Sequence, residues 1–294
     1  MPLLLRTEAQ WRAWRAKRSS TVLGLVPTMG SLHEGHLALM REAKRRAEDV
    51  VTTIFVNPTQ FGPQEDLSRY PRDLEGDVRR CGDVGVDVVF APVPEEMYPQ
   101  GHQTFVEVQG LSRRWEGERR PGHFRGVATV VTQLLALFRP HVAVFGQKDY
   151  QQLKVLERLV KDLHLGVELV ALPTVRDADG LAMSSRNAYL SSNERIAALS
   201  LSRGLRKAQA LAASGETSAE VLMSAVRREL TESGAREDYV ALVDSQTLEP
   251  LEMTDASSPA RMLVAAFVGK TRLIDNAAIS ASGPASASPA PDQA

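Results

Sequence analysis

Residues 26–36, VPTMGSLHEGH, decide how the first half of the chain is interpreted. The apolar run TVLGLVP ends in a turn that contains proline and glycine, and an amphipathic helical pattern follows it. Ser31 precedes Glu34 by three residues, which is the spacing of a capping box and predicts a helix with Ser31 as its N-cap. His33 and His36 then lie on one face of the first turns. The stretch predicts a strand, a turn and a helix that carries two imidazoles near its N-terminus.

Outward from this stretch, β-like runs alternate with helical patterns as far as Pro173. The β-like runs are TVLGLVP, VVTTIFV, VDVVFAP, the short TFVEV at 104–108, HVAVFG and VELVALP. The helical patterns are HLALMREAKRRAED, DLEGDVRRCGDVG, GVATVVTQLLALF and DYQQLKVLERLVKDL. Strands that alternate with helices of this length predict right-handed crossovers and a parallel sheet covered on both faces. We therefore expect an α/β domain over residues 1–175.

The character of the chain changes after Pro173. A polar, glycine-containing stretch, TVRDADGLAMSSRNAYL, is followed by helical patterns around 193–213 and 217–233 and by the β-like runs YVALVDS, RMLVAAFVG and TRLIDNA. Thr217 stands at capping-box spacing before Glu220 and predicts the start of the second helix. These elements predict a smaller α+β domain over residues 176–280. The Ala/Ser/Pro-rich residues 281–294 are predicted to be disordered.

Composition narrows the class of protein. Hydrophobic residues make up 43% of the 294 residues and charged residues 24%, which is typical of a globular chain. Lys plus Arg (35) nearly balances Asp plus Glu (36), so no nucleic-acid partner is expected. The single cysteine, Cys81, excludes an internal disulfide framework and suits a reducing cytosol. No apolar run approaches the roughly 18 residues of a membrane span, and the N-terminus is too charged for a signal peptide. We expect a soluble cytoplasmic protein that does not contact membranes.

The two imidazoles at the predicted helix start have three possible tasks: to bind an anion, to bind a metal or to fill a core. Backbone N–H groups and the positive end of the helix dipole favour an anion such as phosphate, and Gly30 and Gly35 leave room for it. A zinc site would need a third protein ligand beside His33 and His36. The other histidines reach them only through distant folding; they are His102, His123, His141 and His164. Spacing alone leaves the alternatives open.

Polar residues follow other predicted strands. Gln60, in FVNPTQFG, carries a carboxamide that can both donate and accept, which suits a small substrate with hydroxyl and carboxylate groups. In FGQKDYQQLK, Gly146 allows close approach, Lys148 is a compact cation for phosphates, and Gln152 lies one turn further. The loop at 183–187, MSSRN, offers two hydroxyls and a guanidinium for a polyphosphate. Each segment alone also fits an ordinary solvated loop.

Taken together, the motifs resemble one known family. PTMGSLHEGH, FVNPTQFG, YPRD, GQKDYQQL, PTVRDADGLAMSSRN and KTRLIDN occur in the order of the pantoate–β-alanine ligase family, from about Val22 to Asn276. The H-x-G-H element is shared with the wider nucleotidyltransferase superfamily, and the other motifs select the family. The resemblance implies a Rossmann-like N-terminal domain, a smaller C-terminal lid domain and a homodimer.

The resemblance also implies a reaction, in which ATP, (R)-pantoate and β-alanine give pantothenate, AMP and pyrophosphate in the presence of Mg²⁺. The pantoate carboxylate would attack the α-phosphate of ATP to give pantoyl adenylate, and the amine of β-alanine would then displace AMP. An ionised carboxylate needs no general base, which agrees with the lack of a strong case for a Ser/His/Asp triad. The rival readings are another enzyme of the superfamily, such as a cytidylyltransferase-like protein, and a non-catalytic nucleotide-binding or metal-binding regulator.

Site residues follow from the resemblance position by position. The implied ATP-binding residues are Pro27, Thr28, Met29, Gly30, Ser31, Leu32, His33, Glu34, Gly35, His36, Gly146, Gln147, Lys148, Asp149, Val175, Met183, Ser184, Ser185 and Arg186. The implied catalytic residues are His33, His36, Lys148, Ser184, Ser185 and Arg186, with His36 at the position assigned as proton donor. Gln60 and Gln152 match the pantoate-binding pair, and Gln60 also serves β-alanine. Tyr70 matches a site-lining tyrosine, and Asp77 an acidic residue associated with magnesium.

Overall fold

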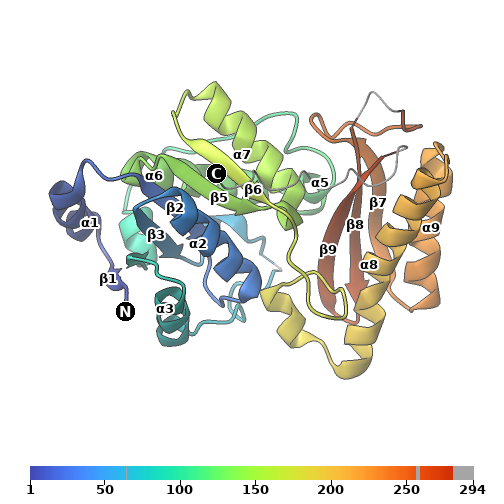
Figure 1. Cartoon of the computed structure of the whole chain (residues 1–294), viewed down its shortest axis with the longest axis horizontal. Helices are drawn as coiled ribbons and strands as arrows, with labels where there is room; N and C mark the ends of the chain where they lie inside the picture. The colour runs from blue at the N-terminus through green and yellow to red at the C-terminus, as the bar shows by residue number, and fades with distance from the viewer. Residues whose placement is uncertain (64, 256–258, 281–294) are drawn as a thin grey trace, which may run out of the picture. The chain divides into compact units, whose positions relative to one another are not determined.

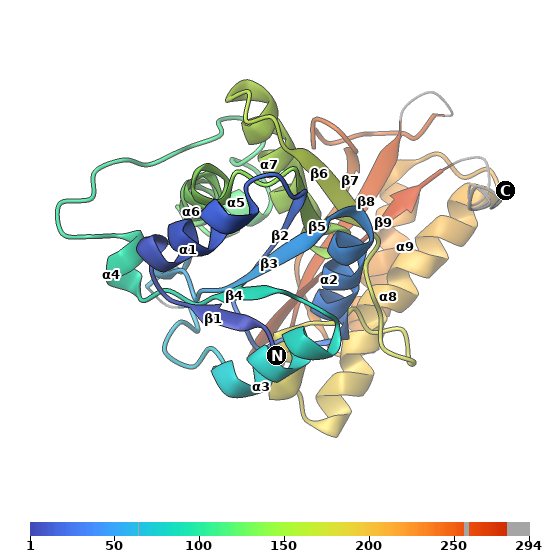
Figure 2. The ribbon, with the colours of Figure 1, turned by 60° about the vertical axis from the view of Figure 1, so that its left-hand side comes forward.

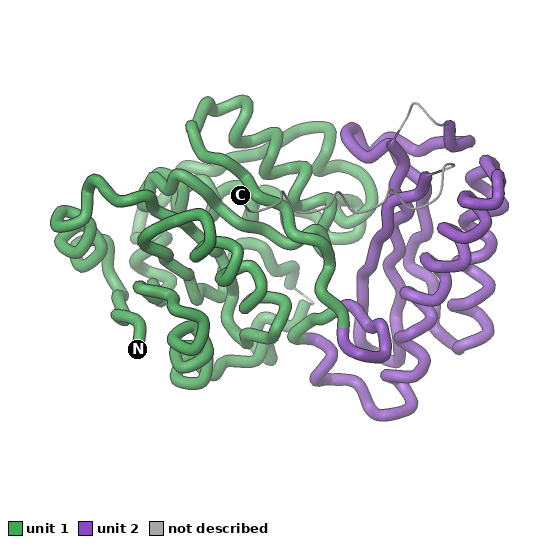
Figure 3. Tube along the Cα trace, viewed as in Figure 1, with its two compact units in different colours: residues 1–176, 183–185 green, residues 177–182, 186–294 purple. Residues whose placement is uncertain are grey.

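The computed structural model describes residues 1–63, 65–255 and 259–280 (Figure 1). The tail predicted to be disordered, 281–294, lies outside these residues. Two compact units share the chain (Figure 3). Unit 1 comprises Met1–Arg176 and Met183–Ser185; unit 2 comprises Asp177–Ala182 and the described residues from Arg186 onward.

Unit 1 contains a six-stranded sheet in which every neighbouring pair is parallel, in the order β1-β4-β3-β2-β5-β6. Its strands are β1 (Leu3–Leu5), β2 (Leu23–Thr28), β3 (Asp49–Ile54), β4 (Val88–Phe90), β5 (Val142–Gly146) and β6 (Glu168–Leu172). The predicted parallel α/β sheet is confirmed. The predicted strand at 104–108 is wrong, because this segment meets no neighbouring strand and the Val106 N–H instead donates to Thr129 Oγ1 at 3.0 Å.

The four helical patterns predicted in the first half are confirmed, and the part of unit 1 that the structure describes adds three shorter helices, at Glu8–Arg15, Pro94–Met97 and Glu116–Arg119, that were not predicted. The helices of unit 1 are α1 (Glu8–Arg15), α2 (Glu34–Arg46), α3 (Leu74–Asp83), α4 (Pro94–Met97), α5 (Glu116–Arg119), α6 (His123–Phe138) and α7 (Tyr150–Asp162). Short 3₁₀ turns occur at η1 (Ala16–Arg18), η2 (Pro58–Gln60) and η3 (Gln147–Asp149).

Helices cover both faces of the sheet, as Figure 2 shows for α2 and α3 on one side and α1 and α6 on the other. On the α2 face, Met40 packs with Val26 and Val144, which are all completely buried. On the other face, the Phe138 ring lies edge-on to Trp11, with 4.5 Å between centroids. Burial of both faces explains why these strands are continuous apolar runs without alternation.

The strand order places a topological switch point beside β2. The chain runs from β2 to β3 and β4 in one direction and then returns to β5 on the opposite side of β2. In open α/β sheets, ligands bind beyond the carboxyl ends of the strands where the winding direction reverses. A ligand site is therefore expected at the loops that follow β2 and β5.

Unit 2 pairs two helices with a small antiparallel sheet. Its elements are η4 (Ser185–Tyr189), shared with the end of unit 1, α8 (Ser192–Ala213), α9 (Ala219–Glu232), β7 (Arg236–Asp244), β8 (Ala260–Val268) and β9 (Thr271–Ile279). The predicted smaller α+β part is confirmed, with Leu205, Leu222 and Val264 in its core. Thr217 does not cap α9 as predicted: the N-cap is Ser218, and the Thr217 carbonyl accepts from the Thr254 N–H at 2.8 Å.

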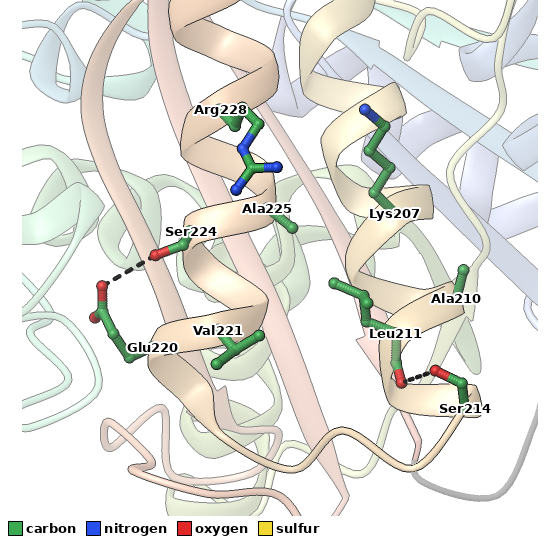
Figure 4. Close-up of a pocket in the computed structure, with 9 residues that line it drawn as sticks. All are labelled: Lys207, Ala210, Leu211, Ser214, Glu220, Val221, Ser224, Ala225 and Arg228. Carbon is green, nitrogen blue, oxygen red and sulfur yellow. Dashed lines mark hydrogen bonds between the residues drawn. The ribbon is translucent and has the colours of Figure 1, made fainter.

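An open groove of about 780 Å³ runs along α8 and α9 (Figure 4). It is lined by Lys207, Ala210, Leu211, Ser214, Glu220, Val221, Ser224, Ala225 and Arg228. None of these residues belongs to the motifs of the sequence, so the groove is not the candidate site. Among the described residues, no helix combines the length and the hydropathy needed to cross a membrane.

Candidate active site

The turn between β2 and α2 does not have the predicted capping geometry. Ser31 has a φ of +51° and Gly30 a φ of +82°, so two consecutive residues are left-handed. An N-cap needs extended backbone, which His33 adopts with φ −132° and ψ 174°, and α2 begins at the next residue. The prediction of Ser31 as N-cap is therefore wrong. Glu34 instead pairs with Arg41 along α2.

The carboxylate of Asp77, on α3, accepts hydrogen bonds from the backbone of this turn. Its Oδ2 accepts from the Ser31 N–H at 2.7 Å and its Oδ1 from the Leu32 N–H at 2.8 Å. Its side chain is 1% exposed, and this burial raises the pKa of the carboxyl against the opposing effect of the two hydrogen bonds. Arg80 lies 3.8 Å from Oδ1 and also donates to the Leu32 carbonyl.

His33 and His36 face each other, with ring centroids 4.0 Å apart. The His33 N–H donates to Nδ1 of His36 at 3.3 Å, which assigns the proton of the neutral His36 ring to Nε2. Burial, followed by the nearby His33 and Lys148, lowers the pKa of His36 to about 3. At neutral pH this imidazole is thus an uncharged hydrogen-bond donor. A Cβ on Gly35 would lie 2.9 Å from the His33 ring, so only glycine fits between the histidines.

Gln60, in the turn after β3, meets the turn after β2. Its Nε2 donates to Met29 Sδ at 3.1 Å, and its Oε1 accepts from Asn57 Nδ2 at 3.0 Å. Asn57 Nδ2 also donates to the Gly126 carbonyl at 3.2 Å, while Tyr98 Oη donates to Asn57 Oδ1 at 2.8 Å. Sequence reasoning treated Asn57 only as a strand breaker. Its signal was the Asn-Pro pair directly after a buried strand.

A second group missed by the sequence lies behind Gln60. His123 is 8% exposed, its Nδ1 lies 2.9 Å from the Gln60 carbonyl, and its Nε2 lies 3.0 Å from Arg120 Nη1. Arg120 in turn pairs with Glu65 through two contacts of 2.8 Å. Burial and the Arg120 charge lower the pKa of His123 to about 4. A single histidine at a helix start carries no periodic signal, so the sequence did not reveal it.

The turn after β5 carries Lys148, whose ammonium group is the cation predicted for this site. Gly146 ends β5, and Lys148 lies in η3, close enough to His36 for its charge to lower the pKa of that imidazole. Asp149 occupies the N-cap position of α7, although no side-chain hydrogen bond caps the helix. Gln152 is half-buried in the first turn of α7.

The segment after β6 returns to the same edge of the sheet. The Met183 N–H donates to the Val175 carbonyl at 3.0 Å, and a Cβ on Gly35 would lie 3.7 Å from Met183 Cβ. Ser185 Oγ is 3.3 Å from the hydroxyl of Tyr70, which is 5% exposed. Ser185, in the loop at 183–187, and Tyr70 therefore lie side by side.

The predicted residues of unit 1 thus come from the carboxyl ends of β3, β2, β5 and β6, with Tyr70 added from the segment before α3 and Asp77 from α3 itself. Pro27 and Thr28 end β2, and the Thr28 hydroxyl accepts from the Gly30 N–H at 3.2 Å. Arg186 follows Ser185 directly along the chain and belongs to unit 2. Neutral imidazole, ammonium, carboxamide and hydroxyl groups together can bind phosphate and a small carboxylate.

Comparison with known proteins gives one family. The family described as pantoate-beta-alanine ligase matches residues 3–278. The pantothenate synthetase of Myxococcus xanthus is 62% identical over 278 residues, which are 94% of this chain and 95% of that protein. The pantothenate synthetase of Anaeromyxobacter dehalogenans is 52% identical over 284 residues, 94% of this chain and 98% of that protein.

Solved structures agree with the sequence comparison. The crystal structure of pantothenate synthetase from Thermus thermophilus superposes with a TM-score of 0.89 at 46% identity, covering 96% of this chain and 100% of that one. Pantoate-beta-alanine ligase from Francisella tularensis, complexed with beta-gamma ATP and beta-alanine, gives a TM-score of 0.79 at 33% identity, covering 94% and 97%.

Proposed function

The chain belongs to the pantoate-beta-alanine ligase family, and we propose that it joins (R)-pantoate to β-alanine, with ATP as energy source, at the carboxyl edge of its parallel sheet. The observation that carries the location is the 3.1 Å contact between Gln60 and Met29. It brings the carboxamide expected to bind pantoate against the turn that carries the paired imidazoles.

In the first step, the pantoate carboxylate attacks the α-phosphorus of ATP. A P–O bond to the carboxylate forms as the bond to the β-phosphate breaks, and pyrophosphate leaves. The carboxylate is ionised at neutral pH, so the protein supplies position and charge rather than a base. Lys148 offsets the phosphate charge, and the Nε2–H of His36 donates to a phosphate oxygen.

The state of His36 refines the role implied by the resemblance. Because the pKa of His36 is about 3, its imidazole is neutral in the free enzyme. A neutral imidazole stabilises developing charge by a hydrogen bond and transfers no proton. In the second step, the uncharged amine of β-alanine attacks the acyl carbon. A C–N bond forms as the acyl C–O bond to AMP breaks, AMP leaves, and the extra proton on the nitrogen passes to solvent. We place Gln60 and Gln152 at the pantoate part of the adenylate, and Ser184, Ser185 and Arg186 at the polyphosphate.

Magnesium is proposed to arrive with ATP as part of the substrate. Mg²⁺ usually keeps several waters and binds through one or two carboxylates together with substrate phosphates. Asp77 does not fit a direct ligand, because it is 1% exposed and both of its oxygens accept backbone N–H groups. Among the described residues, no group of three or more His, Cys, Asp or Glu side chains is placed to hold a metal. We therefore assign no catalytic step to a resident ion.

We also propose that the enzyme works in the cytoplasm as a homodimer. The single cysteine supports a reducing compartment. Cys81 is buried, which raises the pKa of its thiol to about 12 and leaves it unreactive. The dimer rests on the family resemblance and is tested by light scattering of the purified chain.

Substrate-dependent product release tests the reaction. Pyrophosphate release from ATP should require pantoate, and AMP release should require β-alanine as well. His36→Ala should slow pyrophosphate release roughly 100-fold or more while folding is kept, because removal of one such donor typically costs that much. His164→Ala, on an exposed histidine after α7, is the matched control and should keep full activity. Pyrophosphate release with a phosphorylated cosubstrate instead of pantoate would refute the proposal and favour a cytidylyltransferase-like enzyme.

A further inference from the structure

The carboxylate of Asp77 is a candidate for a role that the sequence motifs do not assign. We propose that Asp77 is a positioning residue, which fixes the backbone between β2 and α2 and thereby sets the place of His33 and His36 in the catalytic site. The inference rests on the proposed function, since it gives the turn a catalytic purpose, and it replaces the magnesium-associated role that the resemblance implied for Asp77.

A pair of hydrogen bonds ties Asp77 to the turn between β2 and α2. Asp77 is separated from Ser31 by 46 positions in the chain, yet its two oxygens accept the consecutive N–H groups of Ser31 and Leu32 at 2.7 and 2.8 Å. Only a carboxylate offers two acceptor oxygens in this arrangement, and hydrogen bonds to an ionised acceptor are the strong ones. The turn is therefore held at two adjacent points by one side chain of α3.

The backbone of this turn is strained at Ser31. Left-handed backbone is unfavourable for a residue with a Cβ, and Ser31 adopts it with a φ of +51°. Gly30, before it, has no room for a side chain, because a Cβ there would lie 3.0 Å from Asp77 Oδ2 and 2.9 Å from Ile54 Cγ2. The surroundings thus enforce a conformation that the local sequence does not prefer.

The turn leads directly into the paired histidines. His33 follows Leu32 directly and is the N-cap of α2, and its N–H donates to Nδ1 of His36. A shift of the Leu32 peptide moves the His33 N–H, which selects the tautomer of His36. Arg80 supports the same point, because it donates to the Leu32 carbonyl and lies 3.8 Å from Asp77 Oδ1. Asp77 and Arg80 thus hold both sides of the backbone next to His33.

The test compares two acidic residues at the same helix. Asp77→Asn keeps the size of the side chain but loses one acceptor and places an NH₂ against a backbone N–H. Asp73 caps α3 by accepting from the Gly76 N–H at 3.0 Å, and Asp73→Asn keeps an N-cap, so it is the matched control. We expect Asp77→Asn to slow pantoate-dependent pyrophosphate release roughly 10- to 100-fold and to leave the KM for β-alanine unchanged, while Asp73→Asn stays within about twofold of wild type.

Two further measurements separate positioning from a metal or purely structural role. Imidazole ¹H–¹⁵N spectra of the chain without nucleotide and metal should show altered His36 resonances in Asp77→Asn and not in Asp73→Asn. A Mg²⁺ titration should give the same half-saturating concentration for both variants and wild type. Unchanged His36 resonances, or recovery of Asp77→Asn activity at high Mg²⁺, would overturn the inference.

The outcomes also separate this inference from the proposed function. If wild type forms no pantothenate, the function is refuted, and the imidazole spectra still decide whether Asp77 positions the histidines. If Asp77→Asn does not fold, Arg80→Ala takes its place, because the Arg80 side chain is 50% exposed and its truncation removes little packing. It should shift the His36 resonances in the same direction, and unchanged resonances would again overturn the inference.

Discussion

The histidine behind Gln60 makes acid stability a quantitative test of the structure. His123 is buried between the Gln60 carbonyl, to which its Nδ1–H donates, and an Arg120 N–H, which its Nε2 accepts. Protonation would place an N–H on Nε2 opposite that arginine in a desolvated site. Burial first, and Arg120 second, therefore lower the pKa of His123 to about 4.

The sign and size of the effect follow from proton linkage. In the unfolded chain His123 titrates near 6.5, whereas in the folded chain it titrates near 4, so the unfolded state binds the extra proton as the pH falls. The free energy of unfolding is thus not reduced by His123 above pH 6.5, and it is reduced increasingly as the pH drops towards 4. At about pH 7.5 the His123 contribution is near zero, and at about pH 5.0 it costs about 2 kcal/mol of unfolding free energy.

The assay is urea unfolding at about pH 7.5 and pH 5.0, followed by tryptophan fluorescence. All three tryptophans, Trp11, Trp14 and Trp115, belong to unit 1, so the signal reports the unit that contains His123. His123→Gln keeps a donor and an acceptor but cannot titrate. Because His36 and the other groups titrate alike in both proteins, the difference between their pH dependences isolates His123.

Two results would refute this reasoning. The first is an equal loss of stability in wild type and His123→Gln between the two pH values. The second is an NMR titration in which the His123 ring protonates near its ordinary value. Either result would show that His123 is not held in a desolvated pair with Arg120.

The remaining predictions address the other loops of the site. Gly126→Ala should lower Tm by several degrees and raise the KM for pantoate, since its Cβ would lie 2.4 Å from a backbone oxygen of the turn after β3. Gly146→Ala, whose Cβ meets no atom within 4 Å, should keep Tm and raise only the KM for ATP. Tyr70→Phe removes the hydroxyl beside Ser185 and should lower kcat/KM for ATP about fivefold at constant Tm, as expected for one hydrogen bond. Lys148→Met should slow adenylate formation roughly 100- to 1,000-fold in single-turnover assays and raise the pKa of His36 in an NMR titration.

Much of the fold could be predicted because its signals are local. Strands buried on both faces read as continuous apolar runs, and α2, α6 and α7 show long helical patterns between them. The strand β1 escaped notice because it has only three residues and is defined by its pairing with β4. The run at 104–108 shows the opposite error, since β propensity cannot form a strand without a neighbouring edge.

The residues of the candidate site also differ in how far the sequence could predict them, because some positions depend on local signals and others on long-range contacts. Residues that follow strands in sequence, such as Gln60 and Lys148, were predictable because parallel strands end at one edge of the sheet. Other residues, such as Asn57 and His123, contact Gln60 from the protein interior. Their positions depend on which helix packs against which turn. That packing is set by contacts across more than 60 positions of sequence, for which a single sequence carries no pattern.

The change of N-cap from Ser31 to His33 alters which backbone N–H groups a phosphate could meet. The capping-box rule treats the N–H groups at a helix start as free, and so assigns them to Ser31 or to an anion. In the folded chain the Ser31 and Leu32 N–H groups are already bound by Asp77, whose negative charge also opposes a phosphate at that point. Because α2 begins only at Glu34, the N–H groups of its first turn lie beyond the pair bound by Asp77. Under the proposed function, the neutral imidazole of His36 would donate to phosphate at that turn without introducing a buried charge. We propose that the His36 imidazole adds a donor to the backbone N–H groups at the start of α2, and that Asp77 fixes the preceding backbone and so the place of that imidazole.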